Sequence, residues 1–223
     1  MDLTTAPPPE LVRVAPEDLY ADYARGRPRE GEKADAYQWA KVLDVSSNWV
    51  PPRYRKAHEM PAKARAWADG IVAGADASNL VLMGPPGTGK THGSCAVARY
   101  LTALWEDRHA PSPLLFTSAS DLLARMKDYG KDADRQGAYD KAAKAKVLIL
   151  DDLARSKTTD MDVESYARVL DRRLNALLPT IITTNVFPKE NLIETFGDHL
   201  ASRLLGGSTL VLVGGPDRRY ATT

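Results

Sequence analysis

The sequence has one cysteine, almost no net charge and no long apolar run. The single cysteine, Cys95, excludes a disulfide within the chain, and such low cysteine use is typical of cytosolic proteins. The 30 Lys and Arg residues nearly balance the 29 Asp and Glu residues, so the net charge is +1 and any nucleic-acid contact requires a local basic patch. No apolar stretch approaches the roughly 20 residues of a membrane-spanning helix, and we expect no signal peptide. These absences predict a cytoplasmic protein.

Histidine is also scarce, and the four histidines show no metal-ligand spacing, so we expect no zinc site. The remaining composition is that of an ordinary globular protein, with 43% hydrophobic and 26% charged residues. A chain of 223 residues fits one α/β domain with an extension.

The most informative stretch is rich in glycine and reads GPPGTGKT, which fits the P-loop spacing GxxxxGK[ST]. An apolar run precedes it and a helical pattern follows to about Trp105, so the loop joins a strand to a helix. The glycines let backbone N–H groups approach phosphate oxygens, and the helix N-terminus adds its dipole. Lys90 would reach the β- and γ-phosphates of ATP, and the Thr91 hydroxyl would ligate Mg²⁺. The predicted phosphate-binding residues are Gly84, Pro85, Pro86, Gly87, Thr88, Gly89, Lys90 and Thr91.

A second motif is the apolar run that follows Lys146 and leads into two aspartates, Asp151 and Asp152. A continuous apolar strand fits the buried middle of a parallel sheet, where ligands bind beyond the carboxyl ends of the strands. Asp151 would hold Mg²⁺, directly or through water, and Asp152 would orient and deprotonate the attacking water. One strand after a P-loop, this pattern indicates a Walker B motif.

A later strand ends at Asn185. Its amide would hydrogen-bond the γ-phosphate or the lytic water, or it would form an Asx turn before Pro188; the local sequence leaves both open.

Strands and helices alternate along this part of the chain, which predicts a doubly wound, mostly parallel sheet of five strands. We expect strands near 79–84, 113–117, 146–152, 179–185 and 209–213, and helices near 62–72, 90–105, 121–126, 161–177, 188–195 and 198–205.

Two regions are open to more than one interpretation. Residues 1–47 begin as an extended or disordered arm and continue with two short helices, either packed as an appendage or docking a partner. Residues 128–144 form either a solvated helix face or a surface for single-stranded nucleic acid. The basic residues of the second region are Lys131, Arg135, Lys141 and Lys144.

Taken together, the motifs resemble the AAA+ ATPases of the DnaC/IstB type, which are bacterial and phage helicase loaders and transposition helpers. The resemblance covers roughly 48–220, which we take as the ATPase domain (48–223). The residues that carry it are Gly84–His92 (GPPGTGKTH), Phe116–Leu123 (FTSASDLL), Val147–Leu153 (VLILDDL), Ile181–Asn185 (IITTN), Ser202–Leu205 (SRLL) and Gly215–Arg219 (GPDRR), with Val50–Tyr54 similar to the segment that leads into the family's domain.

The resemblance implies roles for several residues. Asn185 would be sensor 1, and His92 would belong to the ATP-binding loop. Arg203 would be the arginine finger, which reaches the γ-phosphate bound by a neighbouring subunit in an oligomer. Arg219 is the better match for sensor 2, although Arg218 also fits.

The sequence departs from the family pattern in three ways. It ends soon after Arg219, so we expect no C-terminal helical lid. The second acid is Asp152, where many AAA+ proteins have glutamate, and a shorter acid would hydrolyse ATP slowly. The N-terminal region has no cysteine cluster, so we expect no zinc-bearing docking domain.

The first hypothesis for function is a helicase loader of a phage, mobile element or bacterium. It would assemble on single-stranded DNA with ATP and Mg²⁺ and load or remodel a DnaB-type replicative helicase through residues 1–47. The alternative is an IstB-like transposition helper that binds duplex DNA and a transposase. A small-molecule P-loop kinase is a third class, which the acid pair argues against, and a slow nucleotide switch is a fourth, which Asp152 favours.

Overall fold

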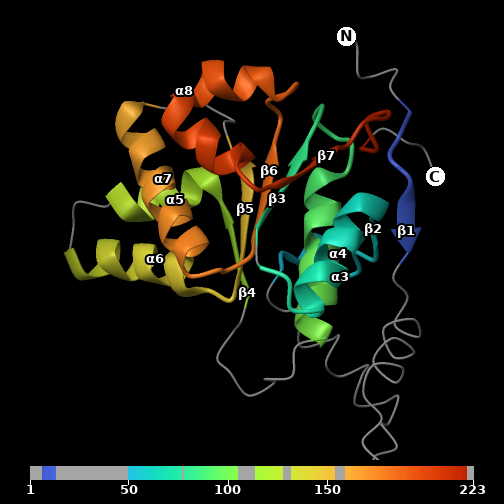
Figure 1. The fold of residues 1–223 in the computed structure, drawn as a ribbon, viewed down its shortest axis with the longest axis horizontal. Coiled ribbons are helices and arrows are strands. Elements are labelled where there is room, and N and C mark those ends of the chain that lie inside the picture. The colour runs from blue at the N-terminus through green and yellow to red at the C-terminus, as the bar shows by residue number, and fades with distance from the viewer. Residues whose placement is uncertain are drawn as a thin grey trace, which may run out of the picture.

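The computed structural model describes residues 7–13, 50–76, 78–104, 114–127, 132–153 and 159–219, in which strands and helices alternate (Figure 1). The elements are β1 (Leu11–Arg13), a 3-10 turn η1 (Pro52–Tyr54), β2 (Glu59–Pro61), α3 (Ala62–Val72), β3 (Asn79–Met83), α4 (Lys90–Leu104), β4 (Leu114–Ser118), α5 (Ala119–Lys127), α6 (Asp132–Lys144), β5 (Val147–Leu153), α7 (Asp160–Asn175), β6 (Thr180–Thr184), α8 (Glu190–Leu205) and β7 (Thr209–Leu212). None of the helices in these ranges is long and apolar enough to cross a membrane.

Five strands form a parallel sheet in the order β4-β5-β6-β3-β7. Helices α3 and α4 cover one face, and α5, α6 and α7 cover the other (Figure 1). Side chains of β3 alternate between two apolar clusters, with Leu80 and Leu82 in the one that includes α3 and α4, and Val81 and Met83 in the other. The chain leaves β3 for the far edge of the sheet and returns to β3's other side with β7. The doubly wound fold class is therefore confirmed.

Local sequence signals fix several helix ends. The Ser118 hydroxyl accepts from the backbone N–H of Asp121 at 3.0 Å and so caps α5. Thr159 and Asp162 form a reciprocal capping box at the start of α7. Helix α8 is interrupted at Gly197, whose φ is 69°, so the two helical pieces expected from the sequence are present as one bent element.

The N-terminal segment departs from the expected division of the chain at residue 47. Strand β1 pairs antiparallel with β2, with Leu11 opposite Pro61. The backbone N–H of Ala62 donates to the Glu10 carbonyl at 2.9 Å, which satisfies one of the free donors at the start of α3. Residues 7–13 therefore pack on the ATPase domain, whereas residues 1–6 and 14–47, including the expected short helices, lie outside the described residues.

Candidate nucleotide-binding site

An open pocket of about 500 Å³ lies beyond the carboxyl ends of β3, β5 and β6. Because the strands are parallel, the P-loop after β3, the acids at the end of β5 and Asn185 after β6 meet at one edge of the sheet. The residues that line the pocket are Arg53, Tyr54, Pro86, Gly87, Gly89, Lys90, Thr91, His92, Asp151, Asp152, Thr183, Asn185 and Arg219.

Two P-loop glycines are required by the segment that follows β7 as well as by their backbone angles. Gly84 has φ 149°, and a Cβ atom there would lie 2.2 Å from the backbone oxygen of Val213. Gly87 has φ 78°, and a Cβ atom there would lie 1.9 Å from Oδ1 of Asp217. A side chain at Gly84 would displace the backbone of this C-terminal segment, and one at Gly87 would displace the Asp217 carboxylate. The segment in turn holds the loop through the Arg218 N–H bond to the Gly87 carbonyl, 2.9 Å long.

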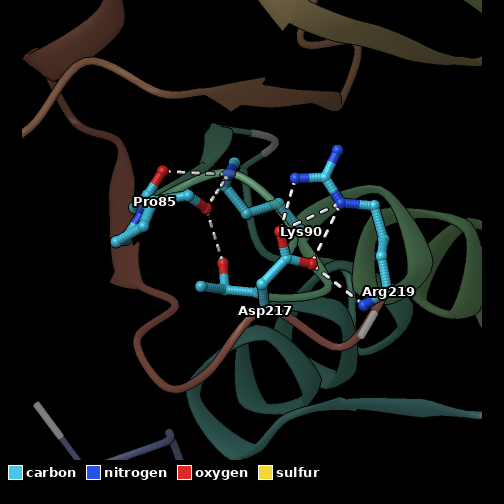
Figure 2. A network of polar contacts seen from close by, with 6 residues as sticks. Pro85, Lys90, Asp217 and Arg219 are labelled. Carbon is cyan, nitrogen blue, oxygen red and sulfur yellow. Dashed lines mark hydrogen bonds and ion pairs between the residues drawn. The ribbon is translucent and has the colours of Figure 1, made fainter. Parts of the chain in front are cut away.

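The Lys90 ammonium is held by carbonyls of its own loop. Its Nζ donates to the backbone oxygens of Gly84 at 2.9 Å and Pro85 at 2.6 Å (Figure 2). Burial lowers the pKa of Lys90 to about 8, and the nearby carboxylates of Asp152 and Asp151 oppose that shift. Phosphate oxygens offer this cation stronger acceptors than neutral carbonyls do.

Arg219 lies beside the P-loop in an ion pair with Asp217 (Figure 2). Its Nη2 donates to Oδ2 at 2.5 Å and its Nε to Oδ1 at 3.0 Å, and these bonds lower the pKa of the Asp217 carboxyl. Arg218 lies close to Gly89, but of these two arginines only Arg219 lines the pocket. The geometry therefore favours Arg219 over Arg218 for the sensor 2 role, which stays a prediction.

The two acids are held by hydroxyls and an amide. Oδ1 of Asp151 accepts from the hydroxyls of Thr91 at 2.9 Å and Thr183 at 2.7 Å. Oδ1 of Asp152 accepts from Nδ2 of Asn185 at 3.0 Å. Burial raises the pKa of Asp151, and the bonds from both threonines counteract that rise.

The oxygen donors of this site fit Mg²⁺. The Thr91 hydroxyl and the Asp151 carboxylate already meet beside the P-loop. Mg²⁺ in phosphate-binding sites takes one or two carboxylates together with nucleotide oxygens and waters, so two protein ligands suffice. The residues that the sequence predicted for the nucleotide and magnesium site therefore lie together, except for Arg203.

Three pocket residues were not predicted as site residues. Arg53 and Tyr54 come from η1, with the Arg53 guanidinium 4.9 Å from the centre of the Tyr54 ring. Burial raises the pKa of Tyr54, while Arg53 and a hydrogen bond with Thr91 oppose the rise. The resemblance of Val50–Tyr54 to the family was the available signal for these two. No local sequence pattern indicated Thr183, because its position in the site depends on how β5 and β6 pair.

Arg203 lies at the opposite edge of the sheet. Its backbone oxygen accepts from Nδ2 of Asn79, the first residue of β3, whereas the P-loop follows the last. A strand of five residues rises about 16 Å, which exceeds the reach of an arginine side chain. Arg203 therefore does not contribute to the nucleotide site of its own chain.

The predicted basic patch lies on α6. Arg135, Lys141 and Lys144 are exposed, and Lys131 lies outside the described residues. Lys144 pairs with Asp140 at 3.0 Å, and Nε of Arg135 donates to the Met126 carbonyl at 3.3 Å. The helix ends just before β5 begins, so Lys144 lies near the strand-start edge, away from the pocket. The exposure of these side chains is compatible with both interpretations of the helix, a solvated face and a surface that binds single-stranded DNA.

Known proteins that resemble this chain in sequence and in structure include ATP-binding proteins. Residues 52–216 match the family model described as IstB-like ATP binding protein. An insertion sequence IS21 putative ATP-binding protein from Pseudomonas aeruginosa is 30% identical over 63% of this chain, which spans about half (52%) of that relative. A crystal structure of the DnaC helicase loader is similar at 27% identity and a TM-score of 0.58, over 73% of this chain and 99% of that one.

A crystal structure of DnaI shares the fold, with a TM-score of 0.57 at 24% identity over 80% of this chain and 93% of that one. The P-loop, the acid pair and Asn185 all lie within the part of the chain that the family model matches. The chain therefore belongs to the family of IstB-like ATP binding proteins, AAA+ ATPases of the DnaC/IstB type.

Proposed function

We propose that this chain hydrolyses ATP in an assembly of several copies on single-stranded DNA, and that the assembly loads or remodels a replicative helicase. The position of Arg203 carries the proposal. Arg203 lies one strand length from its own nucleotide site, yet 29% of its side chain is exposed, and both observations support a role at a neighbouring subunit's site. Hydrolysis would then depend on assembly.

Each residue of the pocket has a role in this reaction. The P-loop amides and Lys90 would bind the phosphates, and Thr91 and Asp151 would hold a magnesium ion, which would supply positive charge to offset that of the phosphates. Asn185 orients the Asp152 carboxylate, which positions the attacking water and accepts its proton. Arg219 can exchange its ion pair with Asp217 for one with the γ-phosphate of bound ATP, because the Arg219–Asp217 pair lies beside the P-loop.

Arg203 completes the site in trans. Charge develops on the transferred phosphoryl group in the transition state, and a guanidinium from the next copy stabilises it. Within a single chain the same guanidinium is paired with Asp171 at 2.7 Å. An isolated subunit therefore binds ATP but turns it over slowly.

The partner is inferred from similarity. The likeness to the DnaC helicase loader supports a helicase, and the exposed Lys141 and Lys144 on α6 are the candidate contacts with single-stranded DNA. The family match and the IS21 relative support a second candidate, a helper of transposition that binds duplex DNA and a transposase. The family match argues against a small-molecule kinase.

A capture experiment separates the two candidates. Tagged full-length chain is incubated with lysate of its host in ATP or ADP, and captured proteins and nucleic acids are identified; Lys90→Ala is the control for nucleotide dependence. Recovery of a replicative helicase in ATP, but not in ADP or with Lys90→Ala, is the expected result. Recovery of a transposase or of duplex DNA without helicase supports the second candidate, and recovery of neither contradicts both.

A further inference from the structure

We propose that Thr183 is a positioning residue that holds both Walker B carboxylates in their working arrangement. The inference rests on the proposed ATPase function. Thr183 lies on β6 opposite the acids and is 1% exposed, so its hydroxyl interacts with protein atoms rather than with bulk water.

The hydroxyl makes one contact with each acidic residue. Its oxygen donates its proton to Oδ1 of Asp151 at 2.7 Å. The same oxygen accepts the backbone N–H of Asp152 at 2.9 Å. The single proton is thus directed at a carboxylate and one lone pair at an amide, which leaves the group no alternative orientation that keeps both bonds.

These contacts occur where the sheet is irregular. Strand β5 pairs with β6 as Leu150 opposite Ile182 and then as Leu153 opposite Thr184. Two residues of β5, the acids, therefore face one residue of β6, which is Thr183. In such a bulge the ladder is disrupted and a backbone donor loses its regular partner, and here the threonine hydroxyl replaces it.

The bulge also holds Asp152 in an unfavourable conformation. Its φ is 58°, in the left-handed region, which aspartate adopts more readily than most residues but still uncommonly. Such a conformation persists when surrounding contacts impose it. The bond from the Asp152 N–H to Thr183 and the bond from Asn185 to its carboxylate are two such contacts.

The arrangement decides which carboxylate oxygens remain available. Thr91 and Thr183 both donate to Oδ1 of Asp151, so Oδ2 would be the oxygen available to a metal ion or its bound water. Removal of the Thr183 hydroxyl takes away one of these two donors and also the oxygen that accepts the Asp152 N–H. Removal of such supporting groups typically lowers metal affinity or activity about tenfold to a hundredfold.

The test compares Thr183→Val, which removes the hydroxyl at nearly the same size, with Thr183→Ser, which keeps it. Thr184→Val is the matched control, because the Thr184 hydroxyl is equally buried on the same strand but donates to the Leu153 carbonyl and accepts from the Val186 N–H. The measurements are kcat and KM for ATP, binding of a fluorescent ATP analogue in EDTA, the Mg²⁺ concentration for half-maximal nucleotide affinity, and a nucleotide-free crystal structure.

For Thr183→Val we expect kcat to fall about tenfold to a hundredfold and the half-maximal Mg²⁺ concentration to rise by at least threefold, while binding in EDTA stays within twofold. The Asp152 backbone should leave the left-handed region in the crystal, and Thr183→Ser should recover most of each effect. An equal kcat loss in Thr184→Val, or a Thr183→Val variant with unchanged Mg²⁺ dependence and unchanged Asp152 backbone, overturns the inference. If the wild type hydrolyses no ATP, the proposed function fails, and the Mg²⁺ and crystallographic results still decide the role of Thr183.

Discussion

Nε of Arg203 donates to Oδ1 of Asp171 at 2.7 Å, so the predicted arginine finger is held by an acid of its own chain. The pair joins the end of α8 to α7 at the edge of the sheet opposite the nucleotide pocket. To act on a neighbour's γ-phosphate, Arg203 must exchange this carboxylate for a more highly charged anion. Both partners are partly exposed, so the exchange costs little desolvation.

Arg203→Ala should keep ATP affinity within about twofold and lower kcat about a thousandfold, the scale of arginine-finger loss. Mixing it with Asp152→Asn should restore part of the activity, because each Arg203→Ala site then has its own Asp152 and a neighbour's Arg203. Steady-state ATPase assays of each variant and of the mixture measure both effects.

Asp171→Asn is the control for the ion pair itself. It leaves Arg203 in place, so at least half of the wild-type kcat should remain. Normal hydrolysis by Arg203→Ala, or no recovery in the mixture, would show that Arg203 is not the finger.

ATP affinity should fall as the pH rises above about 8. Burial lowers the pKa of Lys90 to about 8 in the free protein, and bound phosphates favour its charged form, so binding raises that pKa. Between the free and bound pKa values, nucleotide binding takes up a proton. Calorimetric titrations at about pH 8.5 in two buffers of different ionisation enthalpy measure this uptake.

Lys90→Arg separates this effect from general pH changes, because a guanidinium stays charged over the whole range. We expect the variant to bind ATP more weakly at neutral pH but without proton uptake in the alkaline titration. Lys90→Ala should abolish binding. Equal proton uptake by wild type and Lys90→Arg would assign the titration to another group.

Local patterns were sufficient to predict the five strands of the parallel sheet, most helices and the P-loop, because periodicity and glycine spacing are properties of neighbouring residues. The short strands β1 and β2 were not predicted. The acids and Asn185 could be grouped because parallel strands end at one edge. Thr183 could not be predicted, since the bulge that places it opposite both acids is a matter of register between β5 and β6. The packing of Asp217 on Gly87 likewise joins segments far apart in the chain.

Single-stranded DNA affinity should fall when the charge on α6 is reversed. Lys141→Glu with Lys144→Glu removes two exposed cations from one helix. If both lysines neutralise phosphates, the slope of log affinity against log salt should flatten by about 0.7 for each phosphate that the variant leaves unneutralised. Fluorescence anisotropy with a labelled oligonucleotide at several salt concentrations measures the slope.

Lys63→Glu is the control for a charge reversal elsewhere, since Lys63 is an exposed lysine on α3, on the other face of the sheet. It should leave the salt slope within error of the wild type. Unchanged affinity in the α6 double variant would identify that helix as a solvated face, the other interpretation of its sequence.

Among the residues that the structure describes, Arg173 is the largest fully buried side chain, and its loss should destabilise the fold. Its guanidinium donates to the carbonyls of Ala142, Ala145 and Pro179 and to the Thr180 hydroxyl, at 2.7 to 2.9 Å. It thereby ties the end of α6 and the end of α7 to the start of β6. The sequence predicted a helix near 161–177, but no local pattern indicated that this arginine lies inside.

Arg173→Leu removes the donors and leaves these carbonyls buried without them, at about 1–3 kcal/mol for each unsatisfied group. We expect a loss of about 3–5 kcal/mol in the free energy of unfolding, measured by urea denaturation. Arg172→Leu, at the adjacent exposed position, should change it by less than about 0.5 kcal/mol. Arg173 lies where the strands of the sheet begin, away from the nucleotide pocket, so the ATP affinity of the folded fraction should stay unchanged. If Arg173→Leu is as stable as the wild type, water must replace the guanidinium at these carbonyls.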